Sequence, residues 1–354
     1  MKIVVADPNL APLRAELAAG LPVGAELSWP DRRDDRAVEA ALVDADVLVC
    51  ARCTPAMAAA GKTLRLVQAP GAGVDGIDVA ALPAGTVVAN TFHHEDSIAE
   101  YVLAATILLR RGFLAQDAAL RRDEWASPAY DPAVGWGDSL AAATVGLVGF
   151  GHIGERAWRR FRAFGARGVA VSRRGEVDAA AHGLAWAGPI GEVPTLLEQS
   201  DVVLLSAPLT PATTGLLGAA ELARMRPGAV LVNVGRGPLV DEQALYEALR
   251  CGALGGAAID VWYGYPGPGS GAGSGSRTGP GAGSGGATVA APSALPFRDL
   301  PNVLMTPHSS GLTRQTFAAR VGDIAANVRR LAAGEPLLNV VAVSDGAGQP
   351  AGTR

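Results

Sequence analysis

Two residues of this chain have the types and positions that acid–base chemistry beside a bound carboxylate requires. Arg236 lies in the run VNVGRG at residues 232–237, and His308 ends the run MTPH at residues 305–308. Each follows an apolar, strand-like segment, and open α/β sheets place their ligands at the carboxyl ends of strands. A guanidinium can hold a carboxylate and polarise the adjacent carbonyl, and an imidazole can exchange a proton near neutral pH. Taken alone, an arginine at position 236 is more often a surface ion-pair former, and a histidine at position 308 is more often a satisfied core histidine.

A glycine motif indicates what binds beside them. Residues 149–154 read GFGHIG, after an apolar run at 144–148 and before a helical pattern at 155–164. In this strand–turn–helix context the motif predicts a dinucleotide site, with the pyrophosphate at the helix N-terminus. A glycine-rich turn without a ligand is the alternative. The residues expected at the phosphates are Gly149, Gly151, His152, Ile153 and Gly154.

The end of the next strand bears on the choice of dinucleotide. An acidic residue there would bind the ribose hydroxyls of NAD, but this chain has Ser172 followed by Arg173 and Arg174. A guanidinium fork suits a ribose phosphate. We therefore expect NADP in preference to NAD, the alternative being that both arginines are a solvated loop end.

Composition bounds the class of protein. The 354 residues suffice for two domains, and 49% hydrophobic with 18% charged residues is typical of soluble globular proteins. The apolar runs are too short for a membrane span, and the first residues do not resemble a secretory signal, so we expect a cytoplasmic location. A net charge of -4 gives no reason to expect nucleic acid. Cys50 and Cys53 form a lone CxxC without a second ligand pair, so no metal site is expected.

The order of strand-like runs indicates two α/β units. Short apolar runs at 3–5, 47–49 and 66–68 alternate with alanine-rich helical stretches, which suggests a first parallel sheet. A second series begins at 144–148. Residues 264–296 consist largely of Gly, Ser, Ala and Pro, and we expect a flexible insertion inside the dinucleotide domain rather than a linker between domains.

The chain resembles the D-isomer-specific 2-hydroxyacid dehydrogenases. Residues 201–210, 225–237 and 256–262 follow that family's motifs in order and spacing. The resemblance implies two doubly wound parallel-sheet α/β domains. A split flavodoxin-like substrate domain, 1–97 plus 309–345, would surround a Rossmann dinucleotide domain, 98–308, and the helix at 98–110 would cross between domains and form a homodimer.

The resemblance also implies roles for individual residues. Arg236 would bind the substrate, His308 would be the acid/base, and Asp260 would lie near the nicotinamide amide. The loop at 71–78 looks like the family's carboxylate-binding loop, whose amides act as an anion nest. Its expected substrate-binding residues are Ala72, Gly73 and Val74, and further cofactor contacts are expected at Pro208, Thr213 and Val234.

One position departs from the family pattern. The family usually pairs its histidine with a glutamate shortly after the position of Asp260, and here Tyr265 stands in that place. Without a carboxylate partner, His308 should have a lower pKa than in its relatives. Tyr265 could hydrogen-bond either His308 or the substrate, and we count it among the catalytic candidates.

The expected activity is that of an NADPH-preferring reductase acting on a small anionic 2-oxo acid to give the D-2-hydroxy acid. Formate-, phosphite- or phosphonate-type dehydrogenases of the same superfamily remain alternatives. A dinucleotide-sensing, corepressor-like protein is another, although it would have no need of both Arg236 and His308.

Overall fold

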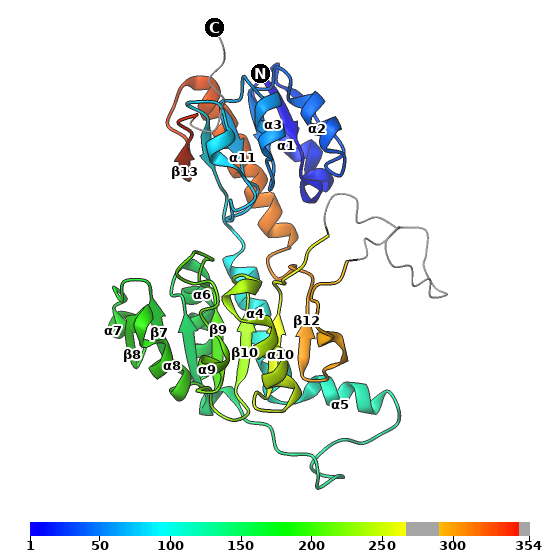
Figure 1. The fold of residues 1–354 in the computed structure, drawn as a ribbon, viewed down its shortest axis with the longest axis vertical. Coiled ribbons are helices and arrows are strands. Elements are labelled where there is room, and N and C mark those ends of the chain that lie inside the picture. Colours follow the sequence, from blue (N-terminus) through cyan, green and yellow to red (C-terminus); the bar gives the residue numbers. More distant parts are fainter. Residues whose placement is uncertain (267–289, 347–354) are drawn as a thin grey trace. The chain divides into compact units, whose positions relative to one another are not determined.

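The computed structural model describes residues 1–266 and 290–346 (Figure 1). The described chain divides into two compact units: unit 1 holds residues 1–94 and 312–346, and unit 2 holds residues 95–266 and 290–311. The resemblance implied crossings after residues 97 and 308, whereas the compact units divide after His94 and Gly311. The expected flexible insertion lies mostly outside the described residues.

Unit 1 is built on one sheet in the order β13-β5-β4-β3-β1-β2, parallel except for β13, which pairs antiparallel with β5. Its strands are β1 (Lys2–Val5), β2 (Glu26–Ser28), β3 (Val47–Val49), β4 (Leu66–Gln68), β5 (Val87–Ala89) and β13 (Val340–Val343). Its α-helices are α1 (Arg14–Gly20), α2 (Asp35–Leu42), α3 (Pro55–Ala60) and α11 (Arg314–Ala333). In Figure 1 the orange-to-red C-terminal segment therefore belongs with the blue N-terminal strands.

Both faces of this sheet are apolar, because each strand sends alternate side chains to opposite sides. Ile3 and Val5 of β1 pack with Leu17 of α1 and Ile324 of α11. The intervening Val4 belongs to a second cluster on the α2 and α3 side. Helices therefore cover both faces and leave the carboxyl ends of the strands as the edge for loops.

Unit 2 has a fully parallel sheet in the order β12-β11-β10-β9-β6-β7-β8. Its strands are β6 (Thr144–Val148), β7 (Arg167–Ser172), β8 (Trp186–Pro189), β9 (Val202–Leu205), β10 (Val230–Asn233), β11 (Gly256–Ile259) and β12 (Val303–Met305). Its α-helices are α4 (Glu95–Arg110), α5 (Phe113–Leu120), α6 (His152–Ala163), α7 (Ala179–His182), α8 (Val193–Gln199), α9 (Ala219–Leu222) and α10 (Glu242–Arg250).

Two clusters cover the faces of the unit 2 sheet. Val102 of α4 and Phe161 of α6 pack with strand residues on one face, and Leu196 of α8 and Leu245 of α10 pack on the other. Strand order reverses between β6 and β9, which is where doubly wound sheets bind ligands. The predicted fold class, two doubly wound parallel-sheet α/β units, is confirmed.

Each predicted strand is present, whereas the helix after the glycine motif begins earlier than predicted. It begins at His152 rather than at residue 155, so the last three residues of the motif, His152, Ile153 and Gly154, form its first turn. Among the described helices, none combines the length and apolar character that crossing a bilayer requires.

Candidate active site

The glycine motif forms a tight turn between β6 and α6. Gly149 has φ of 98°, a left-handed conformation that favours glycine, and a Cβ there would lie 2.8 Å from the Ala207 amide nitrogen. A Cβ on Gly154 would lie 2.3 Å from the Gly149 carbonyl oxygen, so the helix can approach the strand only without a side chain at this position. These two glycines are required by the chain's own packing.

Unlike Gly149 and Gly154, Gly151 has room for a side chain. Its position therefore indicates whether the turn suits a dinucleotide. A Cβ on Gly151 would meet no atom within 4 Å, and the residue has an extended backbone at the N-cap of α6. Protein packing therefore does not demand glycine here, whereas close approach of a pyrophosphate to the backbone would. The first-turn amides of α6 point in the same direction and favour an anion. The turn fits a dinucleotide phosphate.

The residues after β7 are exposed. The Ser172 hydroxyl accepts the Gly175 amide at 3.1 Å, and the Arg174 Nε lies 2.9 Å from a Glu176 carboxylate oxygen. Arg173 and Arg174 are both solvent-exposed. No acidic side chain occupies the end of β7, so the position at which an NAD-binding acid would stand is held by a short serine.

The loops after β9 and β10 are fixed by local hydrogen bonds. The Thr213 hydroxyl donates to the Pro208 carbonyl and accepts the Thr210 amide, both at 2.8 Å, which closes the loop after β9. Val234 is buried, and its amide donates to the Leu205 carbonyl at 3.1 Å. Its side chain is therefore part of the core, and only its carbonyl is available to a cofactor.

A buried aspartate organises the turn that carries His308. Asp260, at the end of β11, is 1% exposed. Its carboxylate accepts the Thr306 hydroxyl at 2.6 Å, the Ser309 amide at 2.9 Å and the Ser310 amide at 3.1 Å, together with the Ser310 hydroxyl. The resemblance placed Asp260 near the nicotinamide amide. In the structure, it is the acceptor that holds residues 306–310 in place.

Tyr265 lies against His308. The Tyr265 hydroxyl is 3.0 Å from His308 Nδ1, and it accepts the Trp262 amide at 3.1 Å. The two rings are 5.7 Å apart between centroids. His308 has φ of 55°, so the Asp260 network maintains a backbone conformation that histidine adopts less readily than glycine does. The sequence left open whether Tyr265 would hydrogen-bond His308 or the substrate. In the structure, it hydrogen-bonds His308.

Arg236 follows β10 and acts electrostatically on this pair. The Asn233 side chain bonds to the Arg236 carbonyl and the Gly235 amide, at 3.0 and 3.1 Å, and thereby shapes the turn. Partial burial lowers the pKa of His308, the positive charge of Arg236 lowers it further, and the carboxylate of Asp260 opposes both. Burial also raises the pKa of Tyr265, so the phenol stays neutral at physiological pH.

The predicted anion loop lies in unit 1, after β4. The Gly71 carbonyl accepts the Thr91 amide at 3.2 Å, and the Ala72 carbonyl accepts the Asn90 side chain at 2.8 Å. Because the carbonyl and N–H of a trans peptide point in opposite directions, the amides of Ala72 and Gly73 face away from these partners. The glycines of this loop have no positive φ, so the alternating backbone of an anion nest is absent. The two tethered carbonyls orient the amides instead.

The sequence did not reveal four contributors to the unit 2 site. Thr306, Ser309 and Ser310 hold Asp260, and Trp262 donates its indole N–H to the Thr306 carbonyl at 2.8 Å. The only available signal was their proximity in sequence to His308 and Asp260. Within residues 1–266 and 290–346, no group of His, Cys, Asp and Glu side chains is arranged to hold a metal ion.

Comparison with known proteins places this geometry in a family. A D-3-phosphoglycerate dehydrogenase of Mycobacterium bovis is 31% identical over 97% of this chain, which spans only 59% of that protein. A glycerate dehydrogenase of Methylorubrum extorquens is 30% identical over 77% of each chain. An NADPH-dependent glyoxylate/hydroxypyruvate reductase of Sinorhizobium meliloti, solved with NADP and sulfate, superposes with a TM-score of 0.73 at 25% identity, over 96% of this chain and 98% of that one.

The family model for the NAD-binding domain of D-isomer-specific 2-hydroxyacid dehydrogenases matches residues 103–310, which include the glycine turn, Arg236, Asp260, Tyr265 and His308. The chain belongs to the D-isomer-specific 2-hydroxyacid dehydrogenase family.

Proposed function

We propose that this protein reduces a small 2-oxo acid to the D-2-hydroxy acid with NADPH as the preferred cofactor. The observation that carries the proposal is the cluster of Arg236, Asp260, Tyr265 and His308 at the carboxyl edge of the sheet that also bears the glycine turn. An arginine beside a proton-exchanging histidine suits a substrate with a carboxylate next to a carbonyl.

The glycine turn and the α6 N-terminus hold the dinucleotide pyrophosphate, and Arg173 and Arg174 hold a ribose phosphate. The bound nicotinamide supplies a hydride to the carbonyl carbon, or takes one back in the reverse direction. Support for NADP comes from Ser172 in place of an acid and from the two exposed arginines after it.

Replacement of both arginines by alanine tests this preference. The catalytic efficiency with NADPH should fall about a hundredfold, while that with NADH stays unchanged, since the two charge-assisted phosphate contacts are each worth roughly 1–2 kcal/mol. Arg167→Ala, at the opposite end of β7, is the matched control. An equal loss of catalytic efficiency with NADPH and NADH would show that the two arginines do not bind a ribose phosphate.

His308 exchanges the proton, and Arg236 holds the substrate. In reduction, the imidazolium gives the proton on Nε2 to the carbonyl oxygen as hydride reaches the carbonyl carbon. In oxidation, neutral Nε2 takes the proton from the hydroxyl. Both roles require a hydrogen on Nδ1 and leave Nε2 to the substrate.

Tyr265 is the partner of that Nδ1–H. Its oxygen has two acceptor lone pairs, so it can accept from His308 Nδ1 as well as from the Trp262 amide. A neutral phenol stabilises an imidazolium less than a carboxylate does. Proton donation, and with it reduction, is therefore present below the lowered pKa of His308 and is lost as the pH rises through it. Oxidation has the opposite dependence.

In unit 1, the amides of Ala72, Gly73 and Val74 bind the substrate carboxylate. Support comes from the tethering of the Gly71 and Ala72 carbonyls, which turns the amides of Ala72 and Gly73 away from β5.

A homodimer is also proposed. The segment from α5 onward exposes large apolar side chains, and Trp125 and Tyr130 stack edge to face with centroids 5.2 Å apart. The exposed members are Phe113, Leu120, Trp125, Tyr130 and Trp136. Such a group on one segment is typical of an association surface, and light scattering of the purified chain measures the mass directly.

The activity itself is tested by offering a panel of 2-oxo acids to the wild-type protein with NADPH and with NADH, and by analysing the product on a chiral column. Cofactor oxidation with formation of the D-hydroxy acid supports the proposal. Dinucleotide binding without turnover across the panel contradicts it and favours a sensor.

A further inference from the structure

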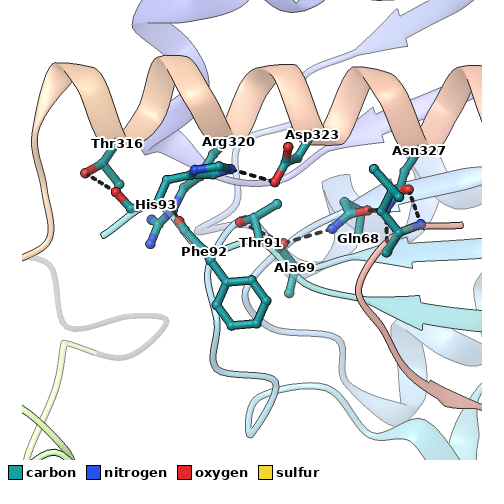
Figure 2. Close-up of polar contacts among 10 residues, drawn as sticks. Gln68, Ala69, Thr91, Phe92, His93, Thr316, Arg320, Asp323 and Asn327 are labelled. Atoms are coloured by element: carbon teal, nitrogen blue, oxygen red, sulfur yellow. Dashed lines mark hydrogen bonds and ion pairs between the residues drawn. The ribbon is translucent and has the colours of Figure 1, made fainter. Parts of the chain in front are cut away.

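A buried arginine lies next to the loop at 71–74 in unit 1. Arg320, on α11, is 7% exposed. Its Nε donates to the Phe92 carbonyl at 2.9 Å (Figure 2). Its guanidinium carbon is 5.1 Å from the centroid of the Phe317 ring. Arg320 therefore places a full positive charge in the interior of unit 1, on the helix that packs against the segment at 91–93.

The charge lies close to the loop backbone. A Cβ built on Gly71 would be 3.8 Å from each terminal nitrogen of Arg320 and 3.9 Å from its guanidinium carbon. The Gly71 and Ala72 carbonyls are tied to Thr91 and Asn90, so they are not turned toward a ligand of the loop. The loop therefore combines oriented amides with a full positive charge beside its first residue.

The positive charge of Arg320 also acts on Asp7, which lies at the same edge of the sheet. Asp7 follows β1, and the positive charges of Arg32 and Arg320 both act to lower its pKa. Burial outweighs them, and the pKa of Asp7 is raised. The positive charge of Arg320 therefore acts on an anionic group at this edge of the sheet.

We propose that Arg320 is a positioning residue for the carboxylate of the substrate: it supplies the fixed positive charge of the 71–74 loop and makes the enzyme select 2-oxo acids over their neutral analogues. This inference rests on the proposed function. Backbone amides alone carry partial charges, whereas a buried guanidinium distinguishes an anion from a neutral ester at short range.

The alternative role for Arg320 is structural. Figure 2 shows that α11 also contacts the segment at 91–93 through Thr316, whose hydroxyl donates to the His93 carbonyl at 3.1 Å, and through Asp323, whose carboxylate is 2.8 Å from His93 Nε2. Arg320 could merely add to these contacts by its bond to Phe92. The experiment must therefore separate charge from packing.

The test compares a 2-oxo acid with its methyl ester in wild type, Arg320→Met and Arg320→Lys. Methionine retains an unbranched apolar side chain and removes the charge, and lysine retains the charge without the fork. Arg329→Met is the matched control, because Arg329 is exposed on the same helix and bonds to the Gly20 carbonyl. The measured quantity is the ratio of kcat/KM for the acid to that for the ester.

We expect Arg320→Met to lower that ratio about tenfold through a higher KM for the acid, Arg320→Lys to lower it less, and Arg329→Met to leave it unchanged. A loss shared equally by acid and ester, or no loss, overturns the inference.

If the Met variant does not fold, Arg320→Lys and Arg320→Gln replace it with the same readout. If the wild type turns over no 2-oxo acid, the proposed function fails by itself. Calorimetric binding of oxalate to wild type and to the Arg320 variants then tests the anion site, with equal affinities overturning it.

Discussion

Each of the two units buries an aspartate just beyond the carboxyl end of a strand. The two carboxylates differ in the number of hydrogen bonds that they accept. Asp7 follows β1 of unit 1 and is 7% exposed, and Asp260 follows β11 of unit 2 and is 1% exposed. Asp7 accepts the Asn9 amide at 2.9 Å. Asp260 accepts two backbone amides and two hydroxyls from residues 306–310.

Both carboxylates are buried, so the two sites differ in the number of hydrogen-bond donors that face the carboxylate. With hydrogen bonds from Asn9 alone, burial raises the pKa of Asp7 in spite of two arginines. Four donors converge on Asp260, and they come from the turn that carries His308. A buried carboxylate can thus be a cost to the fold in one unit and, in the other, the acceptor that holds the turn carrying His308.

Removal of the Asp260 carboxylate should have the largest effect. Asp260→Ala leaves buried amides and hydroxyls without their acceptor, and the free energy of unfolding should fall by about 3 kcal/mol. Urea denaturation measures this loss, and kcat should fall with it because the turn at His308 is released. Asp260→Asn, which keeps one acceptor oxygen, should lose less. An unchanged urea midpoint in Asp260→Ala would contradict the scaffold role.

Variants of Tyr265 should have an intermediate effect, visible in the pH dependence. Tyr265→Glu places a carboxylate beside His308 Nδ1, which should raise the pKa of His308 and extend reduction about one pH unit higher. Tyr265→Phe removes the acceptor and should lower kcat about tenfold. The pH dependence of kcat in both directions is the measurement. Tyr263→Phe, which removes a hydroxyl bonded to the Val240 carbonyl, is the control. Identical pH profiles for wild type and Tyr265→Glu would exclude the pairing.

The smallest effect on the free energy of unfolding is expected at Asp7, where removal of the carboxylate charge should stabilise the protein rather than destabilise it. Because its pKa is raised, the folded protein binds more protons there than the unfolded chain does. Stability from this group is complete below the ordinary aspartate pKa and is lost as the pH rises through the raised one. Asp7→Asn keeps an acceptor for the Asn9 amide and removes the charge. At pH 7 it should be slightly more stable than wild type in urea, and a less stable variant would show that the carboxylate is needed.

Much of this site could be predicted from the sequence. The glycine turn, Arg236 and His308 each lie at the end of an apolar strand, and parallel strands bring such ends to one edge. The strands that the sequence did not predict include the edge strands β2 and β13, whose residues are exposed or only partly buried. The ELS segment of β2 lacks the continuous apolar run by which buried parallel strands are recognised, and the VVAV segment of β13 has such a run but pairs antiparallel at the edge of its sheet.

The long-range partners could not be predicted. Asp260 and the 306–310 turn are about fifty residues apart, and Arg320 lies far along the chain from Gly71. Nothing in the local pattern around Arg320 distinguishes a buried guanidinium from an exposed one on an amphipathic helix. The sequence identified Tyr265 as the substitute for a glutamate, and only the three-dimensional arrangement decided between His308 and substrate as its partner.

The most direct measurement is the rate of NADPH oxidation by a 2-oxo acid, below neutral pH, in wild type and in His308→Gln, with the dissociation constant for NADPH measured on both. The proposed mechanism predicts a loss of kcat between about a hundredfold and ten-thousandfold in the variant, at unchanged NADPH affinity. Equal rates in the two proteins would contradict it and would show that His308 does not exchange the proton.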